Sequence, residues 1–394
     1  MGIRLIFFLL VSLLSTATAQ PLDPARFHEM RSGLANSFHV FQTTQKGRVA
    51  FMGGSITEAS GWRDSVCAYL QQLFPETRFE FINAGISSTG STPGAFRFQR
   101  DVLKNGKVDL FFEEAAVNDP TNGFTGIYQI RGMEGIIRQA LLSNPDMDIV
   151  LMHCVDPEKI ADYQSGKIPE VIRQHEKVAQ RYKINTIHLA REVAERIQAG
   201  EFSWEKDFKD LHPSPFGHGV YAHSIRTFLK NAYERSKQGI AKPHPLPRMI
   251  DKFSYAGGRY VSVTQAAVGK GFTFVPSWVP TDKSPTRKQY VQVPALVGET
   301  PGDSLNFSFT GRAIGICITS GPDAGIIRYS IDGKYMGEKS LFTKWSRSLH
   351  LPWYVLLEDE LPKGSHNVSI IISDRKDPNS LGHAVRIQQF LVND

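Results

Sequence analysis

Strand-like runs alternate with amphipathic stretches through the first 240 residues of the chain. The strand-like runs lie at 49–52, 78–82, 108–118, 148–155 and 185–189. Apolar residues spaced three or four apart predict helices over 62–73, 132–142, 170–182, 189–198 and 220–233. Such alternation is typical of a mostly parallel sheet with helices on both faces. The pattern therefore predicts an α/β domain over residues 20–240.

The pattern changes after a proline-rich segment at 241–249, which we interpret as a linker. Short alternating strands follow at 304–309, 313–318, 326–331, 366–372 and 385–392. Asp332-Gly333 directly after one of them is a strong hairpin signal. The sequence therefore predicts a second domain over 250–394, an all-β sandwich of the jelly-roll kind.

The first residues have the layout of a secretory signal. Arg4 precedes an apolar core at 5–14, and the small residues Ala17-Thr18-Ala19 form a candidate cleavage site. An apolar core of this length is short for a membrane span. We therefore expect a cleaved signal peptide at 1–19, a secreted or periplasmic protein, and no stable membrane insertion.

Charge and composition narrow the classes of partner. The net charge of +6 is spread along the chain without basic blocks, which is permissive for anionic polysaccharide and argues against nucleic acid. The three cysteines, an odd number at wide spacing, predict buried free thiols, although a disulfide stays open in an exported protein. The histidines at 153, 175, 188 and 223 show no ligand-like spacing, so neither a metal nor another cofactor is expected. The sequence does not indicate an oligomeric state.

Four segments carry candidate chemistry, and each also fits an ordinary turn. Ser55 follows Gly53-Gly54 at a strand-to-helix junction, where a serine hydroxyl can act as a nucleophile. Gly85 and Asn118 lie where two further strands end, and His212 lies in a loop before a helix. Ligands of α/β proteins bind at this edge of the sheet. A histidine near such a serine can serve as its general base.

Together the four segments resemble the SGNH (GDSL-type) hydrolase superfamily. The motif Gly-Gly-Ser-Ile-Thr at 53–57 and the segment 94–103 resemble sequences of one branch of this superfamily, the secreted bacterial carbohydrate esterases with a C-terminal β-sandwich. The resemblance implies a three-layer, flavodoxin-like fold with Ser55 as nucleophile and His212 as general base. It also implies an oxyanion hole formed by the N–H groups of Ser55 and Gly85 and the side-chain amide of Asn118.

The last segment departs from the family pattern. The family acid lies three residues before the histidine, and this chain has Lys209 there. Asp210, two residues before His212, is the candidate acid, and a Ser–His dyad is the alternative. Trp62 and Arg63 follow the nucleophile and could contact substrate, Arg63 by pairing with a uronic acid carboxylate. Packing under the first helix and a local ion pair explain them equally well.

The expected activity is removal of O-acyl groups, chiefly acetyl, from polysaccharide or oligosaccharide through an acyl-enzyme. Two alternatives stay open. One is a lipase, lysophospholipase or arylesterase of the same superfamily, and the other is a catalytically impaired carbohydrate-binding protein. Aromatic residues of the second domain could form a sugar-stacking platform or pack in its core: Trp278, Tyr335, Trp345, Trp353 and Tyr354.

Overall fold

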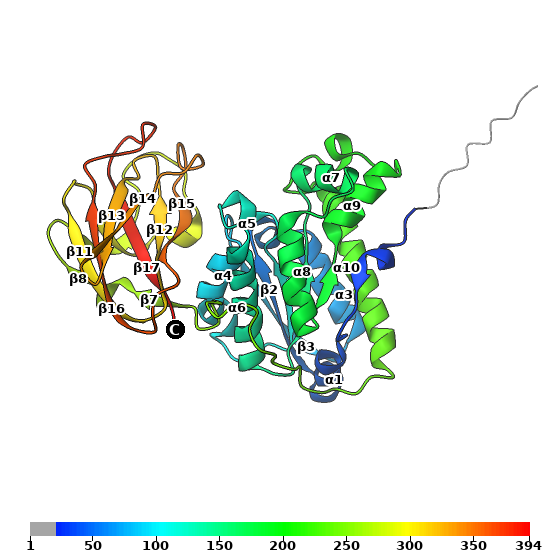
Figure 1. The fold of residues 1–394 in the computed structure, drawn as a ribbon. Coiled ribbons are helices and arrows are strands. Elements are labelled where there is room, and N and C mark those ends of the chain that lie inside the picture. The colour runs from blue at the N-terminus through cyan, green and yellow to red at the C-terminus, as the bar shows by residue number, and fades with distance from the viewer. Residues whose placement is uncertain (1–20) are drawn as a thin grey trace, which may run out of the picture.

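The computed structural model describes residues 21–394. The expected signal peptide at 1–19 lies outside this range. The described chain has an α/β part followed by a β-rich part, and the two lie side by side (Figure 1). No helix among residues 21–394 is long and apolar enough to cross a membrane. The three cysteines are free thiols, as expected, and two of them are buried.

The α/β part is built on a six-stranded sheet with the order β1-β6-β5-β4-β2-β3. Its strands are β1 (His28–Glu29), β2 (Lys46–Gly53), β3 (Arg78–Gly85), β4 (Leu110–Glu114), β5 (Asp148–Met152) and β6 (Asn185–Ile187). All neighbouring strands are parallel except β1 and β6. Taken without β1, the order is the flavodoxin-like one, which turns back at β2 and β4. Ligands bind at such a point, beyond the carboxyl ends of the strands.

Helices cover both faces of this sheet (Figure 1). One core contains residues of α1 (Ala35–Thr44), α3 (Trp62–Leu73), α9 (Leu189–Gln198) and α10 (Pro215–Ser236). The opposite core contains residues of α4 (Ser91–Phe98), α6 (Ile127–Ser143) and α8 (Glu170–Tyr182). Shorter helices are α2 (Ser55–Glu58), α5 (Asn118–Thr121) and α7 (Pro157–Gln164). The expected three-layer fold is confirmed.

Several element boundaries agree with the hydrophobic pattern, and one does not. The helices expected at 62–73, 170–182 and 189–198 are α3, α8 and α9. The helix expected at 132–142 is longer and spans Ile127–Ser143. The strand expected to run to Asn118 ends at Glu114, and Asn118 instead begins α5. Asn-Asp-Pro suits the first turn of a helix, because proline is tolerated there.

The β-rich part consists of two antiparallel sheets. One has the order β15-β12-β17-β10-β9, with β7 also on β17, and the other has the order β14-β13-β16-β11-β8. The strands are β7 (Arg259–Ser262), β8 (Ala267–Val268), β9 (Thr273–Trp278), β10 (Val293–Gly298), β11 (Ser304–Gly311), β12 (Ala313–Ser320), β13 (Ile326–Ile331), β14 (Lys334–Ser340), β15 (Leu351–Glu358), β16 (Gly364–Ile372) and β17 (Val385–Asn393). Phe307 of β11 stacks on Phe390 of β17 with ring centroids 3.9 Å apart, which joins the two sheets face to face. The expected sandwich is confirmed, and so is the hairpin at Asp332-Gly333, which joins β13 to β14.

The segment that connects the two parts is fixed on the α/β part. His244 lies 2.8 Å from a carboxylate oxygen of Asp148 on β5. Arg138 of α6 donates a hydrogen bond of 2.7 Å to the carbonyl of Pro247. The proline-rich segment at 241–249 is therefore held along the first part and does not act as a free tether.

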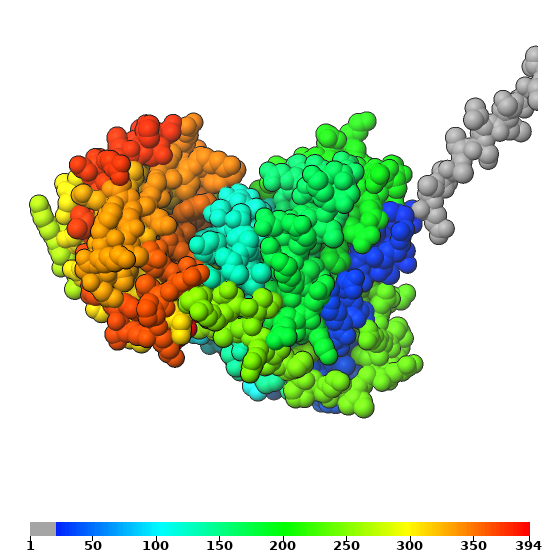
Figure 2. Space-filling model, in the orientation of Figure 1, coloured from blue at the N-terminus to red at the C-terminus, as the bar shows by residue number. Residues whose placement is uncertain are grey.

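A buried guanidinium joins the two parts. Arg131 of α6 is 4% exposed and pairs with Asp251, Asp359 and Glu360 at 3.1, 2.8 and 2.5 Å. Asp359 and Glu360 directly follow β15 of the sandwich. Figure 2 shows the two parts in contact over the cyan region of α4 and α5. The sandwich therefore packs against the side of the α/β part that is formed by α4, α5 and α6.

Candidate active site

Ser55 lies where the sequence predicts it, at the junction of β2 and α2. Its Oγ is 2.8 Å from Nε2 of His212, in the loop that precedes α10. The serine is the first residue of α2, so its own backbone N–H is one of those that helix geometry leaves without an intrahelical acceptor. The structure thus brings together a hydroxyl group, an imidazole base and a backbone N–H that has no acceptor within its helix. That combination can perform nucleophilic acyl transfer.

Gly54 allows Asn118 to approach the nucleophile. A Cβ atom on residue 54 would lie 1.9 Å from Oδ1 of Asn118, which is far inside contact distance. A larger residue at position 54 would therefore push the Asn118 side chain away from Ser55. Gly54 therefore has a steric role at this site.

The acid partner of His212 is only loosely placed. Oδ1 of Asp210 is 4.0 Å from Nδ1 of His212, beyond hydrogen-bond distance, and accepts instead a 3.4 Å hydrogen bond from the His212 backbone N–H. Both side chains are more than half exposed, at 59% for His212 and 65% for Asp210. The other nearby carboxylate, Asp207, accepts from the N–H of Ser203 and turns away from the base. The geometry is that of a Ser–His pair with a distant carboxylate.

The oxyanion donors expected from the sequence need one correction. The N–H of Gly85 donates to Oδ1 of Asn83 at 3.0 Å, so it is already engaged. A Cβ on Gly85 would lie 2.3 Å from the backbone nitrogen of Glu58, which shows that this glycine serves the close packing of α2 on β3. Ser88, three residues on, lines the cavity at Ser55 and has a positive φ of 67°. Its backbone N–H has no acceptor among residues 21–394.

Glu58 connects the nucleophile helix to the loop that contains Ser88. Its Oε2 accepts from the N–H of Ser87 at 2.7 Å and from the Ser87 hydroxyl. Its other oxygen accepts from Nε2 of Gln289, which belongs to the β-rich part, at 2.5 Å. A hydrogen bond of 2.8 Å from Asn122 to the carbonyl of Ser88 holds the loop from the other side. The loop is thus fixed from both parts of the molecule.

Arg97 is completely buried and lies beneath both catalytic loops. Nη1 donates to the carbonyl of Ala84 at 2.6 Å and Nη2 to the carbonyl of Gly53 at 3.1 Å, so the guanidinium joins the ends of β2 and β3. Nη2 also donates to Thr89, and Nη1 pairs with Asp101 at 3.0 Å. The Arg97 side chain has no exposed surface, so its contacts are all with the protein itself.

Trp62 and Arg63 also lie away from the cavity. Trp62 is 1% exposed, packs on Phe51 and donates its indole N–H to the carbonyl of Ile56 at 3.0 Å. Arg63 donates to the carbonyl of Thr57 and pairs with Asp64. The fold therefore supports the packing and ion-pair interpretation of these two residues, and neither of them lines the cavity at Ser55.

A cavity of about 320 Å³ opens at Ser55, and both parts of the molecule line it. The α/β part contributes Ser55 and His212 together with Ser88, Asn118, Thr121 and Asn122. The β-rich part contributes Arg287, Trp345, Ser348, Leu349 and Leu351. Of the aromatic residues considered for a platform, Trp345 is the one in this lining, whereas Trp278 and Tyr354 are buried. The sequence named Trp345 as a candidate platform residue without separating it from the other four, and Arg287 carries no motif that could have identified it.

Two buried carboxyl groups lie below the site at the end of β4. Burial raises the pKa of Glu114 to about 7 and that of Glu113 well above its usual range. Glu114 accepts a 3.4 Å hydrogen bond from the N–H of Val117, next to Asn118. The two groups are screened from solvent and support the turn that presents Asn118.

One group of side chains in the described structure has the arrangement of metal ligands, and it lies apart from Ser55. His153 and His188 follow β5 and β6, and Glu176 lies on α8. The sequence spacing of the histidines did not indicate this group, because its three members come from separate segments of the chain. The catalytic cavity itself is lined by none of the three.

The comparisons with known proteins found a family match in the first part and a structural likeness over both parts. Residues 51–220 match the GDSL-like Lipase/Acylhydrolase family. Among proteins of curated function, none matches the sequence. A two-domain esterase, CEX, active on acetylated mannans and co-crystallized with mannopentaose, has 19% identity and a TM-score of 0.73, over 94% of this chain and 98% of that chain. A second structure of that esterase has 19% identity and a TM-score of 0.74, over 93% and 97% of the two chains.

The acetylxylan esterase Axe2 from Geobacillus stearothermophilus is similar over a smaller region. It has 20% identity and a TM-score of 0.36, and the match covers 46% of this chain and 94% of that chain. The likeness to CEX extends over almost the whole of both chains. It therefore shows that the present chain has the same two-domain fold.

The role of Arg97 can be tested by Arg97→Met. The change leaves two buried carbonyls without their donor and Asp101 without one partner, so the free energy of unfolding should fall by about 3–5 kcal/mol. Urea denaturation measures the loss. The control is Arg78→Met, at the exposed first residue of β3, and it should change stability by less than about 0.5 kcal/mol. Equal effects of the two changes would contradict the assignment.

Proposed function

We propose that this protein is a serine esterase that removes acetyl groups from polysaccharide or oligosaccharide, because residues 51–220 match the GDSL-like Lipase/Acylhydrolase family. The observation that carries the proposal is the 2.8 Å contact between Ser55 Oγ and His212 Nε2, at the mouth of a cavity with free donors. The activity of CEX on acetylated mannans makes acetylated mannan the first substrate to test.

The mechanism follows from these groups. His212 takes the proton of Ser55 as Oγ attacks the ester carbonyl, and then gives that proton to the departing sugar hydroxyl. The negative charge on the carbonyl oxygen is met by the N–H groups of Ser55 and Ser88 and the amide of Asn118. Each such donor is worth about 10²–10³ in rate. Water, activated by His212, then releases acetate from Ser55.

The β-rich part supplies the opposite wall of the substrate site. Trp345 is 46% exposed and borders the cavity, where an indole ring can stack on a sugar. The ammonium of Lys344 lies 4.6 Å from the centre of this ring and covers part of it. Arg287 is exposed in the same lining and can donate hydrogen bonds to sugar hydroxyls or to a uronic acid carboxylate. The proposal therefore assigns substrate binding to both parts of the molecule.

Ser55→Ala and His212→Ala should each lower kcat/KM on 4-nitrophenyl acetate by roughly 10⁴-fold or more, because nucleophile and base act as a unit. Ser348→Ala removes another hydroxyl from the same cavity and serves as the matched control, with less than a threefold effect expected. Activity that survives Ser55→Ala would refute the serine mechanism. A strong preference for 4-nitrophenyl octanoate over the acetate would instead support the lipase alternative.

Asp210→Asn should have a small effect. Exposed ion pairs at such distances contribute less than about 1 kcal/mol, so kcat should fall by less than about tenfold. The effect is measured by comparing kcat of Asp210→Asn with kcat of His212→Ala and of the unchanged protein on the same ester. A fall as large as that of His212→Ala would show that Asp210 closes onto Nδ1 during catalysis, and the dyad interpretation would then be wrong.

Trp345→Ala should separate binding from chemistry. Loss of about 1–1.5 kcal/mol of stacking should raise KM for an acetylated manno-oligosaccharide about tenfold and leave kcat on 4-nitrophenyl acetate within twofold. Tyr335→Ala is the control, since Tyr335 is exposed on β14 and does not line the cavity. An unchanged KM in Trp345→Ala would remove the β-rich part from the proposed binding site.

A further inference from the structure

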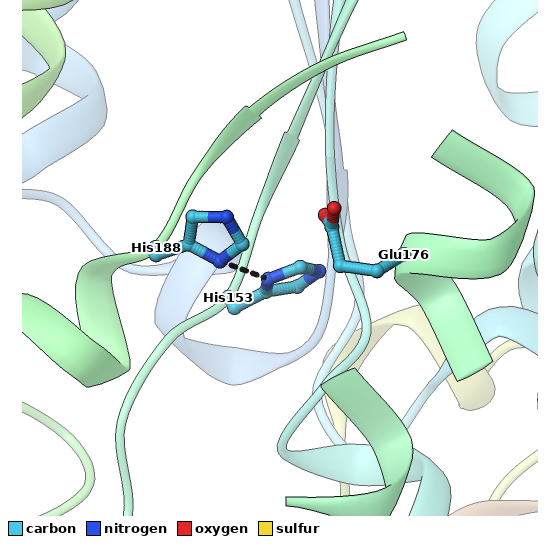
Figure 3. Close-up of side chains that lie close together, drawn as sticks. All are labelled: His153, Glu176 and His188. Carbon is cyan, nitrogen blue, oxygen red and sulfur yellow. Dashed lines mark hydrogen bonds between the residues drawn. The ribbon is translucent and has the colours of Figure 1, made fainter. Parts of the chain in front are cut away.

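Three side chains from separate segments meet beyond the carboxyl ends of β5 and β6. Figure 3 shows His153 and His188 with their rings turned toward each other, and the carboxylate of Glu176, from α8, beside the His153 ring on the side away from His188. One ligand atom from each residue lies within 4.8 Å of those of the other two. The segments are 23 and 12 residues apart along the chain, so the group is assembled only by the fold.

The spacing of the two imidazoles fits a shared ion better than a mutual hydrogen bond. Nδ1 of His153 is 3.4 Å from Nδ1 of His188. This distance is long for a hydrogen bond that involves nitrogen. Two nitrogens at 2.0–2.1 Å from a tetrahedral ion are about 3.3–3.4 Å apart. The pair therefore already has the separation of two ligands.

Burial supports the form of histidine that metals bind. Burial, together with the neighbouring histidines, lowers the pKa of His153 well below its usual range, and burial also lowers the pKa of His188. Both imidazoles are thus neutral at pH 7, and no proton needs to leave before an ion binds. This is a supporting observation, and the geometry of the three groups carries the inference.

The carboxylate of Glu176 is held with one oxygen available. Its Oε2 accepts from Nη2 of Arg31 at 2.6 Å, while Nη1 of Arg31 donates to the carbonyl of Ile184 and the hydroxyl of Thr186. The guanidinium therefore fixes the orientation of Glu176 from outside the cluster. Oε1 of Glu176 is buried and has no hydrogen-bond partner in the described chain. Such outer partners are typical of metal sites, because they orient the ligands.

We propose that His153, Glu176 and His188 bind a divalent transition-metal ion such as Zn²⁺. Two imidazoles and one carboxylate are a donor set that zinc prefers, and three protein ligands leave one coordination position for water. The ion would join the ends of β5 and β6 to α8. Strand β4 separates these strands from β2, which leads to Ser55, so the site is a stabilising one and lies outside the proposed esterase mechanism.

The test uses the full chain after removal of metal with a chelator. His212 is exposed and could bind zinc itself, so His212→Ala is the background for all variants. Titration calorimetry with ZnCl₂ should show one ion per chain, and zinc should raise the melting temperature. His188→Ala and Glu176→Gln, made separately in this background, should each weaken binding at least about tenfold and remove the shift. His223→Ala, at an exposed position on α10, is the control. It should keep both the zinc affinity and the rise in melting temperature.

Cobalt gives an independent readout, because tetrahedral Co²⁺ has strong visible absorption that hydrated Co²⁺ lacks. The background protein should develop this absorption at one equivalent, and Glu176→Gln, which keeps an acceptor for Arg31, should not. Absence of zinc binding in the background protein would overturn the proposal. Binding that is equal in His188→Ala, Glu176→Gln and His223→Ala would overturn it as well. Neither result depends on esterase activity, so the proposed function is tested separately.

Discussion

The buried guanidinium of Arg97 is the constraint on which the geometry of the site depends. A cation without exposed surface needs partners, and the two terminal nitrogens of Arg97 find them in the carbonyls that end β2 and β3, in Thr89 and in Asp101. Those carbonyls belong to Ala84 and Gly53, which stand directly before the two catalytic loops. Because the guanidinium is planar and rigid, it fixes the distance between the two strand ends. The separation of Ser55 from Ser88 follows from that distance.

The same region joins the α/β part to the sandwich. The hydroxyls of Tyr260 and Tyr290 both hydrogen-bond to that of Tyr354, at 2.6 and 3.0 Å, beside the helix that carries Arg97. Arg100, one turn further on, lies over the ring of Tyr260. Together with the bond from Gln289 to Glu58, these contacts make the sandwich part of the support of the catalytic loops. Its position beside the cavity is therefore set by buried polar groups, which need defined partners.

The sequence predicted the architecture well because each element is consistent locally. Helix α3 has the predicted bounds, and Ser55, Asn118 and His212 meet because strand ends of a parallel sheet share one edge. The predictions that differ from the structure concern local geometry that depends on tertiary contacts. Gly85 and Ser88 lie in one loop, and which N–H stays free depends on Asn83. Trp62 follows the nucleophile in the sequence, yet the start of α3 turns it into the core.

The residues that the sequence did not assign to a particular site depend on contacts between distant segments. Trp345 and Arg287 reach the cavity only through the packing of the sandwich, for which no local pattern exists. His153, Glu176 and His188 lie on two strand ends and a helix, without the short spacing by which ligand sets are recognised in a sequence. The pairing of Glu176 with Arg31 depends equally on tertiary structure.

The exposure of His212 and Asp210 connects the geometry to the chemistry. In the free protein the two side chains lie in water, where charges 4 Å apart interact by about 1 kcal/mol. A sugar that occupies the cavity between Ser55 and Trp345 would displace water from the imidazole and lower the local dielectric. The imidazolium that forms during acyl transfer would then interact more strongly with the negative charge on the ester oxygen, while Asp210, at 4.0 Å, would still contribute little. The sandwich wall, by closing the cavity on one side, would thus act on catalysis through the solvent that it excludes.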